Sequence, residues 1–62
     1  MGPLYKSPFG WGFIQRSEYT PGCWWVFSHV GRPWEFIAGR MAEYLGWLES
    51  IGVLKETWLR IW

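Results

Sequence analysis

The sequence is poor in the residues that cross-link small domains. Its 62 residues include one cysteine, Cys23, and one histidine, His29. A single cysteine excludes a disulfide within the chain, and these two residues fall short of the four ligands that a closed zinc site requires. A chain of this length buries only about 60% of the surface that it exposes when unfolded. Its stability must therefore come from an unusually aromatic core or from a partner.

Long apolar runs are also missing. The longest stretch without Asp, Glu, Lys or Arg extends from Tyr19 to Gly31 and is interrupted by Pro21 and Gly22. It is far shorter than the roughly 20 apolar residues of a membrane-spanning helix. Residues 1–10 contain no apolar segment typical of a signal peptide. We expect no transmembrane span and a cytoplasmic protein, with any membrane association made through a partner.

The chain carries little net charge. Six basic and five acidic side chains leave a formal charge of +1. Strong non-specific binding of nucleic acid usually requires a dense basic patch, and the sequence shows none. No pair of carboxylates suggests general acid–base catalysis, and no glycine loop has a phosphate-binding motif. We therefore expect no enzymatic activity, cofactor or metal. The acidic residues are spread along the chain, at Glu18, Glu35, Glu43, Glu49 and Glu56.

Aromatic residues are abundant. Seven tryptophans, three tyrosines and four phenylalanines make up 23% of the chain. Each aromatic side chain can bury roughly 150–250 Å², which is more in total than so small a core can hide. Some of these side chains must lie exposed or be covered by another molecule. Tryptophan, tyrosine and arginine are the residues most enriched at the energetic centres of protein interfaces.

The N-terminal half, residues 1–33, has the pattern of a β-hairpin. Two runs rich in aromatic and β-branched residues, residues 11–16 and 23–30, flank a turn segment that contains Pro21 and Gly22. Side chains alternate between the two faces of a strand. The second run would therefore place Trp24, Val26 and Ser28 on one face and Trp25, Phe27 and His29 on the other.

The C-terminal half, residues 34–62, has the pattern of an amphipathic helix. It contains no proline, and Pro33 suits a first helical turn. Gly52 is expected to end or kink the helix. The predicted fold is a single small α+β domain over residues 1–62, with the hairpin packed on one long or kinked helix. Apolar residues recur with a 3–4 spacing, at Trp34, Ile37, Met41, Tyr44, Leu48 and Ile51.

Two features of the predicted helix indicate a second buried face. Ala38, Ala42, Gly46 and Ser50 form a row of small residues, which permits the close approach of another backbone. Large aromatic side chains also lie away from the main apolar stripe. The candidate partner-binding residues are Trp24, Trp25, Phe36, Arg40, Trp47 and Trp58.

Two short motifs in the N-terminal half resemble the cold-shock domain. "GWGFI" at 10–14 resembles the family's aromatic motif on one strand, and "VFSH" at 26–29 resembles the motif on the next strand. The resemblance departs from the family at Phe9, where a basic residue is usual, and after His29, where further strands are usual. It implies that single-stranded nucleic acid stacks on an aromatic platform made of Trp11, Phe13, Phe27 and His29.

The first functional prediction is a non-enzymatic protein-interaction module or accessory subunit. It would dock on a larger assembly, or associate with itself, through a tryptophan-rich surface. The first alternative is a cold-shock-like binder of single-stranded nucleic acid. The second alternative is a peptide that lies on a membrane surface, which tryptophans and an amphipathic helix would suit.

Overall fold

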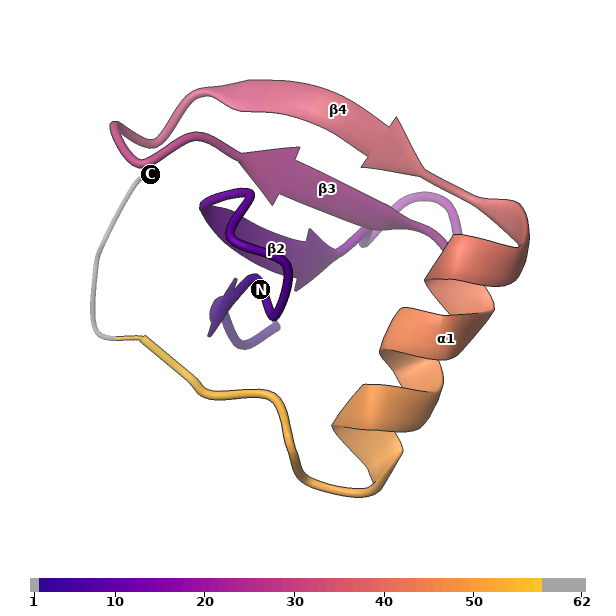
Figure 1. Cartoon of the computed structure of the whole chain (residues 1–62). Coiled ribbons are helices and arrows are strands. Elements are labelled where there is room, and N and C mark those ends of the chain that lie inside the picture. Colours follow the sequence, from indigo (N-terminus) through magenta and orange to yellow (C-terminus); the bar gives the residue numbers. More distant parts are fainter. Residues whose placement is uncertain (1, 58–62) are drawn as a thin grey trace.

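In the described part of the chain, a four-stranded sheet is followed by one helix (Figure 1). The computed structural model describes residues 2–57. The strands pair antiparallel in chain order, so that the sheet is a simple meander. This confirms the predicted small α+β fold. The elements are β1 (Tyr5–Lys6), β2 (Phe13–Arg16), β3 (Trp24–Phe27), β4 (Pro33–Ile37) and α1 (Gly39–Ser50).

The hairpin prediction is confirmed, whereas the predicted start of the helix is wrong. β2 and β3 pair around the turn with the alternation expected from the sequence: Trp24 and Val26 are buried, and Trp25 is exposed. Residues 34–37 belong to the strand β4 and not to the helix. Trp34 and Ile37 fit a helical spacing, but this segment is rich in residues that favour strands, and β3 offers it an edge on which to pair.

Glycines at both ends limit the helix to Gly39–Ser50. Gly39 has a φ of +67°, which lets the chain turn sharply out of β4. At the other end, Gly52 has a φ of +77°. Its amide donates to the Glu49 carbonyl and the Val53 amide donates to the Leu48 carbonyl, at 3.0 and 3.2 Å. This pair of bonds is the Schellman termination motif, so Gly52 ends the helix rather than kinking it. The helix predicted over residues 34–62 is therefore wrong for residues 53–57, which are not helical.

The core lies between one face of the sheet and one side of α1. The sheet contributes mainly Ile14, Trp24 and Val26, which are fully buried. The helix contributes Ala42, Leu45 and Leu48. The predicted apolar stripe is therefore wrong in phase, although two of its members, Ile37 and Leu48, do contact the core. The helix is rotated so that the small Ala42 faces the sheet, while three members of the predicted stripe are exposed, namely Met41, Tyr44 and Ile51.

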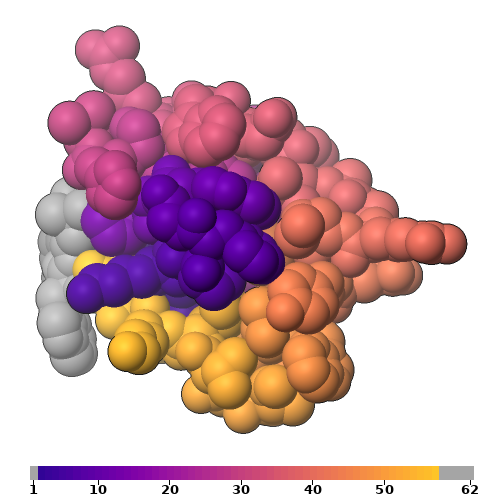
Figure 2. Space-filling view, in the orientation of Figure 1, coloured from indigo at the N-terminus to yellow at the C-terminus, as the bar shows by residue number. Residues whose placement is uncertain are grey.

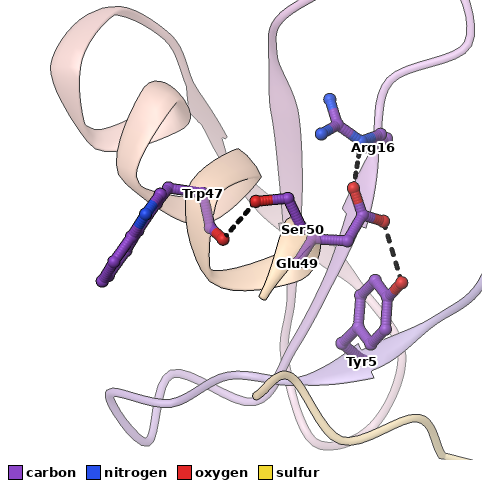
Figure 3. Close-up of polar contacts among 5 residues, drawn as sticks. All are labelled: Tyr5, Arg16, Trp47, Glu49 and Ser50. Carbon is purple, nitrogen blue, oxygen red and sulfur yellow. Dashed lines mark hydrogen bonds and ion pairs between the residues drawn. The ribbon is translucent and has the colours of Figure 1, made fainter. Parts of the chain in front are cut away.

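A polar cluster joins the helix to the first two strands (Figure 3). The Tyr5 hydroxyl donates to Glu49 Oε2 at 2.8 Å, and Arg16 Nε donates to Glu49 Oε1 at 2.6 Å. The Arg16 guanidinium also lies 4.8 Å from the centre of the Trp24 ring. A Cβ on Gly46 would come within 3.2 Å of this guanidinium. Gly46, one of the predicted small residues, thus leaves room for Arg16.

The segment after the helix returns to the β1 edge of the sheet (Figure 1). The Lys6 amide donates to the Lys55 carbonyl at 2.8 Å, and the Thr57 amide donates to the Leu4 carbonyl at 2.9 Å. Tyr5 and Glu56 form an isolated antiparallel bridge between these bonds. The described part of the chain therefore covers one sheet edge, while β4 forms the other.

Candidate binding surface

The sheet has a second face, directed away from the helix. The registers place Tyr5, Ile14, Val26 and Trp24 on the face that meets α1. Because side chains alternate along a strand, their neighbours in sequence lie on the opposite side. We call this opposite side the outer face. Its strand residues are Lys6, Phe13, Gln15, Trp25, Phe27, Trp34 and Phe36.

The first row of the outer face runs across three strands. Lys6 pairs with Phe13, and Phe13 pairs with Phe27. The His29 ring meets the Phe13 ring edge to face, with the ring centres 5.8 Å apart. Phe13 and Phe27 are half-buried, and His29 is exposed. The row therefore presents one ammonium group beside three rings.

The second row also runs across three strands and is anchored at one end. Gln15 is buried, and its Nε2 donates to the Gly2 carbonyl at 2.8 Å. Gln15 pairs with Trp25, and Trp25 pairs with Phe36. The rings of Trp25 and Phe36 lie 4.7 Å apart, and each residue is 38% exposed. This row places two partly exposed rings, tilted by 60° to each other, next to the first row.

The structure brings together three of the four residues that the cold-shock resemblance implies. Phe13, Phe27 and His29 lie on the first row. Trp11 does not join them, because it packs against the core and its ring lies 4.7 Å from that of Phe9. The platform on the outer face therefore contains Trp25 and Phe36 in addition, and lacks Trp11.

The predicted partner-binding residues are scattered. Trp24 is fully buried in the core, so its place in that set is corrected to a structural one. Its indole Nε1 is buried without a hydrogen-bond partner. Arg40 is exposed near the start of α1. Trp58 lies outside the described residues. Only Trp25 and Phe36 meet on the outer face.

Trp47 belongs to a second exposed group beside the helix. It is 54% exposed and stacks on Tyr44 with the ring centres 5.9 Å apart. The Phe9 ring lies 6.1 Å from that of Tyr44. In the space-filling view, the indigo N-terminal segment lies against the orange helix (Figure 2). We call Phe9, Tyr44 and Trp47 the helix-side cluster. Sequence reasoning named Trp47 but missed Phe9 and Tyr44, because Tyr44 fitted the core stripe.

Charge is unevenly distributed around the outer face. None of its strand residues is acidic, and Lys6 supplies one positive charge. Glu35 and Glu56 pair with residues of the opposite face, Val26 and Tyr5. Glu18 lines a shallow depression beside Trp25. The first row is therefore the more favourable one for an anionic ligand.

Comparison with known proteins found no match. No protein-family model, no curated protein and no solved structure matches it. Within residues 2–57, no helix has the length and apolar character needed to cross a membrane.

Proposed function

We propose that this chain is a small non-enzymatic module that binds single-stranded nucleic acid on the outer face of its sheet. The observation that carries the proposal is the first row, in which Lys6, Phe13 and Phe27 follow one another across adjacent strands and His29 lies against Phe13. The protein-docking module that we put first from sequence becomes the second candidate, because its predicted residues do not form one surface.

Aromatic rings on neighbouring strands suit the stacking of unpaired bases. Adjacent strands lie about 4.8 Å apart, so Phe13 and Phe27 hold two rings close together on one open surface. Each base stacked on an aromatic side chain contributes about 1–3 kcal/mol. Stacking requires no specific base, because every base has a π face. We therefore expect weak preference among sequences.

The charges near this row support an anionic ligand despite the small net charge. Glu49 is occupied by Arg16 and Tyr5 on the opposite side of the sheet. Glu35 and Glu56 also pair with residues of that side. Lys6 remains on the outer face without an ion pair among the described residues. Among the described residues, a ligand with phosphate groups would thus meet a positive charge on this row and no carboxylate from its strand residues.

The test is a titration of a labelled single-stranded oligonucleotide, followed by fluorescence anisotropy. Phe27→Ala should lower the affinity about 5- to 100-fold, the equivalent of one lost stacking contact. His29→Ala should also lower the affinity. This substitution leaves the half-buried rings of Phe13 and Phe27 in place. Tyr19→Ala is the control, because Tyr19 is 90% exposed in the turn between β2 and β3. Equal affinities for all four proteins would overturn the proposal.

A docking site for another protein is the second candidate, and the helix-side cluster favours it. Interface centres are enriched in aromatic residues, and Trp47 is more than half exposed while it stacks on Tyr44. Trp47→Ala should change the free energy of unfolding by less than about 1 kcal/mol and should abolish any self-association seen by light scattering. A variant that unfolds would show that Trp47 is structural.

The membrane-surface alternative stays a prediction.

A further inference from the structure

Two lysines face each other at the β1 edge of the sheet. Tyr5 bridges to Glu56, and the Lys6 amide donates to the Lys55 carbonyl. In this antiparallel pairing Lys6 therefore stands opposite Lys55. Alternation places both side chains on the side away from Tyr5 and Glu56, which is the side of the outer face. The first row is thus extended to Lys55, Lys6, Phe13 and Phe27.

Like charges placed directly opposite each other in a sheet are unfavourable. Both lysines are exposed, and neither forms an ion pair among the described residues. The nearest acid in sequence, Glu56, pairs with Tyr5 on the other side. Within residues 2–57, the two positive charges thus lie together with no acidic residue in the pocket that they line. A bound anion would remove the repulsion.

A shallow pocket of about 310 Å³ lies at this pair. Its lining residues include no acid; they are Lys6, Ser7, Pro8, Val53, Leu54 and Lys55. The Ser7 hydroxyl accepts a hydrogen bond from the Phe9 amide at 3.1 Å, so its own proton is available to donate. Two ammonium groups and one hydroxyl are donors suited to phosphate oxygens.

We propose that this pocket binds a phosphate group, and that the group is a backbone phosphodiester of the strand whose base stacks on Phe13. The choice of phosphodiester rests on the proposed function and on the pairing of Lys6 with Phe13. Both lysines bind the phosphate through their side-chain ammonium groups, because the Lys6 amide already donates to the Lys55 carbonyl.

The first arm of the test measures oligonucleotide affinity against salt concentration. Lys55→Gln should lower the affinity about 3- to 10-fold at low salt and reduce the salt slope by about 0.7, the value for one phosphate contact with a single strand. Arg40→Gln removes the same charge from the exposed start of the helix and should leave the slope unchanged. Equal effects of the two substitutions would overturn the phosphate site.

The second arm uses inorganic phosphate against chloride at equal ionic strength, with amide chemical shifts as the readout. Phosphate should shift the Lys6, Ser7 and Lys55 signals in the wild type and not in Lys55→Gln. If phosphate shifts these signals but no oligonucleotide binds, the pocket stands and the proposed function fails. If the oligonucleotide binds and responds to Phe27→Ala but not to Lys55→Gln, the function stands and the pocket is overturned.

Discussion

At the scale of single residues, Glu49 makes the polar contacts that join the helix to the sheet. Its two carboxylate oxygens accept from Tyr5 and Arg16, which lie on different strands (Figure 3). Burial raises the pKa of the Tyr5 hydroxyl to about 12, with further contributions from the Glu49 hydrogen bond and from the charges of Glu49 and Glu56. The folded chain therefore holds the Tyr5 proton more tightly than the unfolded chain does.

This shift predicts a loss of stability at high pH. Below pH 10 the tyrosine is neutral in both states, and the contribution is fully present. As the pH rises from 10 towards 12, Tyr5 ionises first in the unfolded chain, so the free energy of unfolding falls. Absorbance titration of the folded protein should show one late tyrosine. Tyr5→Phe should remove that late component and Tyr19→Phe should keep it; the reverse result would contradict the assignment.

Gly12 is a second residue on which the fold depends. Its φ is +112°, and a Cβ there would lie 2.2 Å from the Phe27 carbonyl oxygen. Gly12→Ala should destabilise the fold by about 3 kcal/mol, through backbone strain and overpacking together. Gly10 also has a positive φ, but a Cβ there would meet nothing within 4 Å. Gly10→Ala should therefore cost only about 1–2 kcal/mol. Urea unfolding measures the free energy of unfolding of both variants. Equal losses would contradict the predicted clash between a side chain at Gly12 and the Phe27 carbonyl.

At the scale of elements, the orientation of α1 decides which apolar residues belong to the core. Leu45 is fully buried, whereas Met41 is exposed although both are apolar residues on the same helix. Leu45→Ala should cost about 2–5 kcal/mol, because it leaves a cavity. Met41→Ala should cost less than about 1 kcal/mol. Thermal unfolding followed by circular dichroism compares the stability of the two variants. A larger loss of stability for Met41→Ala would mean that Met41 lies on the buried side of the helix, as expected from sequence.

The strand β4 lies at the edge of the sheet and has features that hinder its pairing with another chain. Among the described residues it pairs only with β3, and it begins at Pro33. The Glu35 carboxylate accepts from the Phe36 amide at 3.1 Å. Prolines, register irregularities and charges are the usual means by which edge strands avoid aggregation, and the β3–β4 pairing contains such a register shift.

Removal of this charge should expose the edge. Glu35→Val should increase self-association with rising protein concentration, measured by light scattering, because it frees the Phe36 amide and adds an apolar side chain. Glu43→Val on the exposed side of α1 is the matched control and should associate less. Equal association of both variants would show that loss of charge, and not the strand edge, is responsible.

At the scale of the whole molecule, the arrangement of charges matters more than their sum. The net charge is only +1, yet Lys6 and Lys55 line one pocket without an acid while Glu49 is occupied on the other side of the sheet. One phosphodiester bound in this pocket predicts a salt slope of about −0.7 for a single strand. Affinity measured over a series of salt concentrations tests this. A slope near zero would mean that no phosphate is contacted.

Several features of the protein follow from sequence alone because they depend on neighbours along the chain. The β2–β3 hairpin and the alternation of Trp24 and Trp25 arise from local backbone preferences and a period of two. Gly52 is predicted as a break in the helix, but the sequence leaves open whether it ends or kinks the helix. The resemblance also selected Phe13, Phe27 and His29, which lie together on the outer face.

Other features were decided only by the tertiary structure, because they depend on contacts between distant segments. Residues 34–37 fit a helical spacing, but pairing with β3 makes them a strand. The side of α1 that is buried depends on how Ala42 and Leu45 meet the sheet. Lys6 and Lys55 are 49 positions apart in sequence and become neighbours only when the segment after the helix returns to β1. Local sequence carries no information on such pairings, since they depend on how the chain closes on itself.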